Sequence, residues 1–187
     1  MTPSERLEAL GAHHDLVDWS RAATDWRQLW DTCPRGDWLL AIASRAGADH
    51  RAVVRAACDC ARLALEHAPD GEPAVLEAIE TAESWAARPA TDPTASGAPC
   101  EAAAEAAEAA AALASDPAAQ AAMVAAAAAA RSTADPGVAA TAAASAAQAA
   151  VFDAGECAMM AALGYAQQQC VARVRAALPY ASVAPLL

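Results

Sequence analysis

The sequence contains no lysine, and all 12 of its positive charges are arginine. Against 23 Asp and Glu residues, these give a formal net charge of −11. A protein that binds nucleic acid or an anionic membrane surface needs basic charge facing the phosphates, so this balance argues against both kinds of partner. The same acidic charge favours attraction toward a cationic partner.

Large apolar side chains are also scarce. The chain has one Phe, two Tyr and five Trp. Its 57% hydrophobic content is high only because 62 residues are Ala, which leaves 44 other apolar residues. Alanine is the best helix former and is depleted in strands, so all-β and parallel α/β folds are excluded and an all-α fold is predicted.

Motifs that carry common chemistry are missing as well. There is no CxxC pair, no HxxxH pair, no phosphate-binding glycine loop and no serine-nucleophile triad. Cys58 and Cys60 lie two apart on a predicted helix, where their sulfurs point about 200° apart. At the helix start His13-His14-Asp15, neighbouring helical side chains diverge by about 100°. The sequence therefore predicts no metal site and no cofactor, and it favours a non-enzyme.

No secretory leader or membrane span is expected. Residues 1–10 lack a basic start followed by an apolar run. The stretch 109–130 carries one charge, but Pro117 lies near its middle and alanine is only weakly lipophilic. The expected location is the cytoplasm, where the six cysteines would stay reduced and buried.

Capping and turn residues divide the chain into about eight or nine helices. In the first half, Asp37 and Asp49 are predicted N-caps, and Gly11 and Gly47 are predicted stops. The predicted helices of this half span residues 3–10, 14–32, 38–45, 50–67 and 73–88. A Pro-rich linker, 89–99, then separates an N-terminal helical bundle, 1–88, from an Ala-rich array, 100–187, and the two are expected to form one compact body.

The second half is nearly a repeat. Asp116-Pro117 and Asp135-Pro136 each place Asp at an N-cap and Pro at the first helical position, 19 residues apart. This spacing predicts four stacked helices of about 14 to 25 residues. Residues 101–150 contain 30 Ala and only four large apolar side chains. Such helices must approach closely, near the lower end of the ~8–10 Å range of interaxial distances.

Motifs between residues 30 and 90 resemble a known family. One helix reads Ala-Cys-Asp-Cys-Ala over residues 57–61, and an acidic turn follows with Asp70, Glu72 and Pro73. The next helix reads Ala-Ile-Glu-Thr-Ala over residues 78–82, with Trp85 three residues on. Together with the upstream segment 33–38, these motifs resemble the Imm-5-like family of immunity proteins from bacterial polymorphic toxin systems.

This resemblance implies an all-helical fold and a role in neutralising a cognate toxin by occluding it. It implies no catalytic residue and no cofactor. Members often carry a basic pair around the Pro of the turn, where this chain has Glu72-Pro73-Ala74. That departure implies a different partner. The acidic charge suits a toxin with a basic face, such as a nuclease.

Eight residues are candidates for contacts with a partner or ligand. Trp19, Trp26 and Trp30 fall on one apolar helical stripe. Core packing is a simpler explanation of this stripe than a ligand groove, and a core indole N–H is expected to find an acceptor. Asp59 and Glu80 lie mid-helix among small residues, and a buried carboxyl has a raised pKa unless it is paired; the structural alternative pairs Asp59 with Arg55 or Arg62. The candidates are Trp19, Trp26, Trp30, Arg35, Asp37, Trp38, Asp59 and Glu80.

A second function class remains open. The Trp residues, together with Cys157, Met159, Met160 and Cys170, could hold a small apolar molecule between helices. The protein would then sequester an antibiotic or act as a small helical enzyme of a natural-product pathway, with Asp59, Glu80 or a His as polar contact. That alternative calls for a pocket of ~300 Å³ or more, lined by Trp and a buried carboxylate, whereas a solid interior with an acidic exterior favours protein binding.

Overall fold

The computed structural model describes residues 1–68, 73–89, 91–92, 96–154 and 158–187, and within them all regular structure is helical. The all-α prediction is confirmed, but the count of eight or nine helices was too low. The α-helices are α1 (Pro3–Ala9), α2 (His14–Ser20), α3 (Trp26–Thr32), α4 (Gly36–Ala46), α5 (His50–Arg62), α6 (Pro73–Ala87), α7 (Ala98–Leu113), α8 (Pro117–Arg131), α9 (Ala139–Asp153), α10 (Met159–Ala177) and α11 (Tyr180–Val183). Short 3-10 turns, η1 (Leu65–His67), η2 (Pro136–Val138) and η3 (Ala184–Leu186), complete them.

The single helix predicted over 14–32 is two helices, which is one reason for the higher count. The Asp25 side chain accepts the backbone N–H of Gln28 at 2.8 Å, and Gln28 in turn accepts the backbone N–H of Thr24 at 2.8 Å. This reciprocal cap starts a new helix at Trp26. A local cap therefore overrides the apolar stripe of tryptophans that suggested one continuous helix.

Several other predicted helix boundaries are confirmed, although the helix predicted over 50–67 ends at Arg62 and Asp135 caps a 3-10 turn instead of α9. Thr2 and Glu5 form the capping box of α1, and Asp49 caps α5 by accepting the backbone N–H of Ala52 at 2.8 Å. Gly47 ends α4 in the left-handed conformation at φ 81°. The four helices expected in the second half are present as α7 to α10, with 16, 15, 15 and 19 residues.

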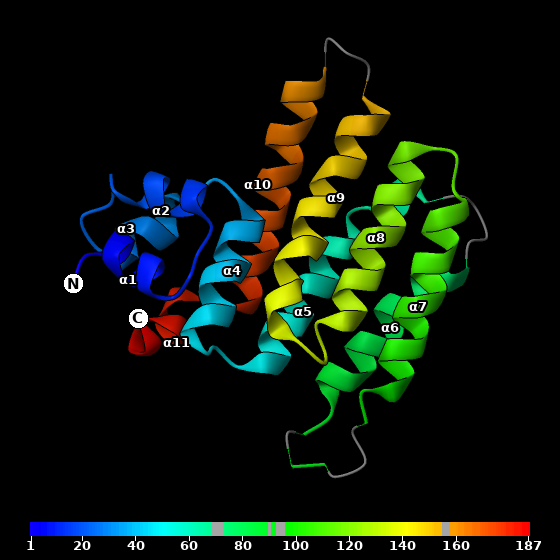
Figure 1. Cartoon of the computed structure of the whole chain (residues 1–187), viewed down its shortest axis with the longest axis horizontal. Helices are drawn as coiled ribbons and strands as arrows, with labels where there is room; N and C mark the ends of the chain where they lie inside the picture. Colours follow the sequence, from blue (N-terminus) through cyan, green and yellow to red (C-terminus); the bar gives the residue numbers. More distant parts are fainter. Residues whose placement is uncertain (69–72, 90, 93–95, 155–157) are drawn as a thin grey trace.

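The helices lie in two layers (Figure 1). One layer contains α4, α9, α8 and α7 in that order, and behind it α10, α5 and α6 lie side by side. Helices α1 to α3 lie at the α4 end. The C-terminal α11 returns to the same end, where the guanidinium of Arg27 in α3 lies 5.2 Å from the centre of the Tyr180 ring.

The buried side chains of the first half differ in size from those of the second. Helices α1 to α4 bury large residues such as Leu7, Leu29, Trp30 and Leu39. In contrast, α8 buries eleven residues, of which ten are Ala. All these side chains nevertheless belong to one continuous apolar cluster. Since an alanine methyl removes little apolar area from water, α8 depends on helix propensity and on neighbours close enough to touch it.

Two expectations from the sequence need separate comment. None of the described helices combines the length and the apolar character that a bilayer crossing requires. The boundary predicted between an N-terminal bundle and an Ala-rich array stays a prediction, although α8 and α9 of the second half contact α5 of the first directly.

Candidate functional site

Four of the eight candidate residues lie together where α2 meets the start of α4. The Trp19 and Trp38 rings are 5.4 Å apart between centroids and tilted by 47°. The Arg35 guanidinium lies 4.6 Å from the centre of the Trp38 ring. Asp37 accepts from Arg35 Nε at 3.1 Å and from Arg35 Nη2 at 2.6 Å. We call these four residues the Trp19–Trp38 cluster.

The sequence suggested that Asp37 caps α4, but it does not. The helix begins one residue earlier, at Gly36, and Arg35 occupies the N-cap position without a side-chain cap. Asp37 lies in the first turn, with its side chain 10% exposed, and holds the guanidinium of Arg35 instead. This bond raises the pKa of Arg35 and fixes the guanidinium plane against Trp38.

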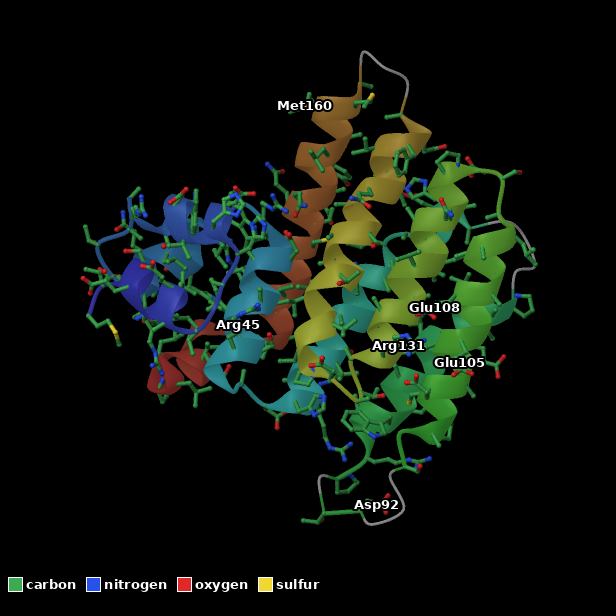
Figure 2. All side chains as sticks on the ribbon, in the orientation of Figure 1. Arg45, Asp92, Glu105, Glu108, Arg131 and Met160 are labelled. Atoms are coloured by element: carbon green, nitrogen blue, oxygen red, sulfur yellow. The ribbon has the colours of Figure 1, made fainter. Side chains whose placement is uncertain are left out.

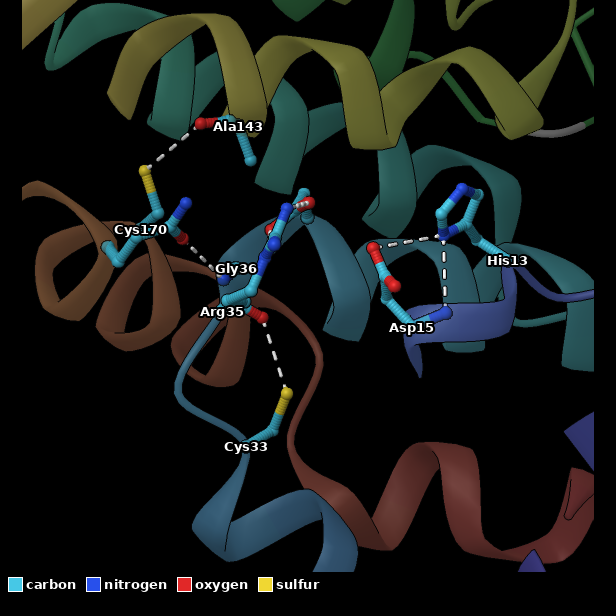
Figure 3. Close-up of polar contacts among 9 residues, drawn as sticks. His13, Asp15, Cys33, Arg35, Gly36, Ala143 and Cys170 are labelled. Carbon is cyan, nitrogen blue, oxygen red and sulfur yellow. Dashed lines mark hydrogen bonds and ion pairs between the residues drawn. The ribbon is translucent and has the colours of Figure 1, made fainter. Parts of the chain in front are cut away.

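The start of α4 rests directly on α10 (Figure 3). The Gly36 backbone N–H donates to Gln167 Oε1 at 3.1 Å. A Cβ atom at Gly36 would lie 2.6 Å from the Cβ of Cys170 and 3.0 Å from its backbone carbonyl carbon. Cys170 is itself held against α9, because its Sγ donates to the carbonyl oxygen of Ala143 at 3.7 Å. Only a glycine allows this approach, and the approach positions Arg35.

A groove opens beside the cluster, between the start of α4 and helices α9 and α10. Its volume is about 350 Å³. We call it the Arg35 groove. Its lining residues are Arg35, Ala144, Gln148, Val151, Leu163 and Gln167. The guanidinium and two amides therefore face small and branched apolar side chains, which suits a mixed apolar and hydrogen-bonding protein surface.

Helices α9 and α10 expose large apolar side chains toward the end of their hairpin, and one of them, Tyr165, lines a different pocket from the Arg35 groove. Phe152 is 55% exposed, Met160 80% and Tyr165 67%. With Met159, they make up four of the eight large apolar residues that are exposed in the described chain. Met160 projects at the far end of α10 (Figure 2), one turn before Leu163 of the Arg35 groove. Exposed apolar side chains gathered in this way are typical of interaction surfaces.

The pocket expected for a small-molecule protein is not among four well-formed pockets of the described residues. These have volumes of about 330, 240, 520 and 350 Å³, and neither a Trp nor a buried carboxylate lines any of them. The one on the opposite side of the hairpin, about 330 Å³, is lined by Tyr165, His67 and an exposed Glu66, among others. Of the soft residues suggested for ligand binding, Cys157 lies outside the described residues.

The other two tryptophans do not join the cluster by any described ring contact. Trp26 is partly buried at the start of α3. Trp30 is 1% exposed and belongs to the core. Its Nε1 has no hydrogen-bond acceptor among the described residues, so the expectation that each core indole finds one is wrong here. The Trp30 backbone carbonyl, by contrast, accepts from Arg175 Nη2 at 2.7 Å, which ties α3 to α10.

Asp59 and Glu80 are also separate from the cluster. Glu80 is exposed on α6. Asp59 makes no ion pair with Arg55 or Arg62, since Arg62 instead donates to both carboxylate oxygens of Glu83, at 2.6 and 2.7 Å. Partial burial raises the pKa of Asp59, and the nearby charge of Arg173 offsets only part of that effect.

Replacing Asp59 with Asn is expected to change how stability depends on pH. A carboxyl whose pKa is raised by folding favours the folded state while it is protonated, and this contribution is lost as pH rises through the folded-state pKa. The free energy of unfolding of Asp59→Asn relative to wild type should therefore rise between pH 3 and pH 7. Urea unfolding at several pH values measures this. A relative stability that falls over the same range contradicts the assignment.

The opposite edge of the molecule is acidic. Helices α6 and α7 contain six Glu and no Arg. On α7, Arg131 of the neighbouring α8 binds Glu101 and Glu108, while Glu105 lies exposed between them (Figure 2). The hydrogen bond from Arg131 lowers the pKa of Glu108. This edge stays negatively charged at neutral pH.

No protein-family model, no curated protein and no solved structure matches this chain. Of the motifs that carry the family resemblance, Asp70 and Glu72 lie outside the described residues. Sequence reasoning named the four residues of the Trp19–Trp38 cluster among its candidates but did not group them, and it missed Gln148, Val151 and Leu163. These three residues are larger than the alanines around them, and this was the only available signal that they have a special role. The signal does not indicate which helix faces them.

Proposed function

We propose that this protein is an immunity-type binding factor that neutralises a cognate bacterial toxin by covering its active surface, with no chemistry of its own. The observation that carries the proposal is the Trp19–Trp38 cluster beside the Arg35 groove. Trp and Arg dominate the energetics of protein interfaces, particularly next to pockets that exclude water. Here the Arg35 guanidinium, which Asp37 holds against the Trp38 ring, connects the two Trp rings to an apolar groove between α4, α9 and α10.

The charge of the molecule supports a basic partner. The net charge of −11 attracts a cationic surface over a distance and accelerates encounter with it. Complementary charge also suppresses wrong partners. A toxin that acts on nucleic acid presents a basic face to its substrate, and an acidic protein bound there would exclude that substrate. The toxin-neutralising class itself rests on the family resemblance of residues 30–90.

The test uses the purified toxin domain encoded beside this chain's gene. Titration calorimetry should show binding, and the bound toxin should lose activity. Trp38→Ala is expected to weaken binding at least about 30-fold, the effect of losing an interface residue worth about 2 kcal/mol. Leu113→Ala, which removes an exposed apolar side chain far along the fold on α7, is the matched control and should bind normally.

Circular dichroism of both variants checks that they remain folded. Folded Trp38→Ala that binds as tightly as wild type contradicts the assignment of the cluster. A neighbouring toxin domain that does not bind the wild-type chain, or the absence of any toxin-bearing gene beside it, contradicts the proposed function itself.

A further inference from the structure

Gln167 brings a buried amide to the wall of the Arg35 groove, and half of that amide is unused. The residue is 9% exposed, and its Oε1 accepts the backbone N–H of Gly36 at 3.1 Å. A backbone N–H requires an acceptor, so the amide oxygen is fixed toward Gly36 and the NH₂ group points away from it. That NH₂ group donates no hydrogen bond to any residue that the structure describes.

The unused NH₂ group faces the groove. Among the described side chains that are not exposed, Trp30 Nε1 is the one nitrogen that is both fully closed off and unpaired, so Gln167 Nε2 keeps access to solvent. Gln167 lines the Arg35 groove and none of the other three pockets. A donor on a largely buried side chain costs free energy while it stays unpaired. The groove therefore favours an acceptor that enters it.

Two more side chains add donors to the same groove. Arg35 uses Nε and Nη2 for Asp37, while its Nη1 makes no hydrogen bond within the described part of the chain. Gln148 is exposed and contributes a second amide. No carboxylate is among the lining residues. The others are apolar: Ala144, Val151 and Leu163.

The charges around the groove favour an uncharged acceptor. Asp37, whose side chain is 10% exposed, already neutralises the Arg35 guanidinium, and the charge of Asp15 also acts on Arg35. The whole chain carries a net charge of −11. A carboxylate would enter this negative field beside a cation that is already paired. An amide carbonyl accepts the same N–H groups without bringing a charge.

We infer that the Arg35 groove binds an uncharged, extended peptide segment of the partner protein. A backbone carbonyl of that segment accepts from Gln167 Nε2, and an aliphatic side chain packs against Val151 and Leu163. Main-chain hydrogen bonds then supply affinity and the apolar wall selects the side chain. The volume of about 350 Å³ is at the small end of ligand-sized sites, so a short part of the segment enters. The inference rests on the proposed function for the existence of the partner.

The test titrates the isotope-labelled full chain with N-acetyl-leucine N′-methylamide, a minimal uncharged peptide unit, and follows it by NMR. The Gln167 side-chain NH₂ signals should shift and saturate, with a dissociation constant in the millimolar range that so small a ligand reaches. N-acetyl-leucine, which carries a carboxylate, should bind at least about tenfold more weakly. Adding one alanine at each end of the neutral probe should tighten binding at least about threefold, because an extended segment gains main-chain contacts.

Gln167→Glu separates the free donor from the fold. Its carboxylate still accepts the Gly36 N–H but offers no N–H to the probe, so binding should weaken at least about tenfold. Gln168→Glu makes the same change at an exposed neighbour that lies outside the groove, and this matched control should bind as wild type does. Leu163→Ala leaves the bond to Gly36 intact and should weaken binding at least about threefold. Circular dichroism checks that all three variants fold.

Four results would overturn the inference. They are the absence of a saturable shift at Gln167, equal binding by Gln167→Glu and Gln168→Glu, tighter binding of the carboxylate, and no gain from the longer probe. The last result would assign the groove to a small free amide instead. None of these titrations uses the toxin. A chain that binds the probe but no neighbouring toxin would contradict the proposed function, whereas a chain that binds the toxin but not the probe would contradict this inference alone.

Discussion

Gly36→Ala is expected to lower the free energy of unfolding by about 3 kcal/mol, the upper end of ordinary overpacking costs. The added Cβ would lie 2.6 Å from the Cβ of Cys170 and 3.2 Å from the backbone nitrogen of Val171. A flexible side chain could move aside, but the backbone of a long helix cannot. Relief requires α4 and α10 to separate, which also breaks the hydrogen bond from Gly36 to Gln167. Chemical denaturation of the purified variant measures the loss.

Gly164→Ala supplies the matched control with the opposite sign. A Cβ at Gly164, on the exposed side of α10, meets no atom within 4 Å. Alanine stabilises a helix interior by about 0.5–1 kcal/mol relative to glycine, so this variant should be more stable than wild type. Equal effects of the two substitutions, or a Gly36→Ala protein as stable as wild type, would contradict the close approach of α4 to α10.

Ala129→Leu is expected to cost about 1–3 kcal/mol, or more where the neighbouring helices cannot yield. Ala129 is fully buried on α8, a helix that contacts α5, α6, α7 and α9. Leucine and alanine have similar helix propensities, so the loss reports packing rather than helix formation. The additional carbon atoms have no space unless α8 moves away from its neighbours, and such movement loses many methyl contacts.

Ala112→Leu is the control for this substitution. Ala112 is exposed on α7. The same chemical change there should alter the free energy of unfolding by no more than about 0.5 kcal/mol, as surface substitutions usually do. Urea unfolding of both variants gives the comparison. If Ala129→Leu is as stable as Ala112→Leu, there is free space around α8. That result would contradict an interface packed closely through alanine methyl groups.

The sequence predicted those parts of the fold that local signals determine. The caps Thr2, Asp49 and Asp116 start helices where expected, because each side chain accepts the backbone N–H three residues further on. The tryptophan stripe misled for the same reason. Its periodicity was real, but the cap formed by Thr24, Asp25 and Gln28 divides it. Where an apolar stripe favours one continuous helix and a cap favours a break, the relative free energies of the two arrangements decide which one forms.

The candidate site was predictable only in part. Arg35, Asp37 and Trp38 are close in sequence, so their mutual contact follows from the start of one helix. The groove beside them depends on Gly36 meeting Gln167, which lies 131 residues further along. Helices faced with methyl groups offer few side-chain features to distinguish one register from another. The packing order of α8, α9 and α10 could therefore not be predicted from their sequence pattern. Without that order, the groove residues Gln148 and Leu163 could not be predicted either.

The central claim is that α8 and α9 form a rigid core through close contact of small side chains, so that function resides on the exterior. Amide hydrogen exchange of the native protein tests it most directly. The backbone amides of Ala125–Ala130 and Ala142–Ala149 should exchange only through global unfolding, with opening free energies equal to the stability measured by denaturant. Exchange of these amides as fast as that of a fraying helix end would show that the Ala-rich half is no packed core.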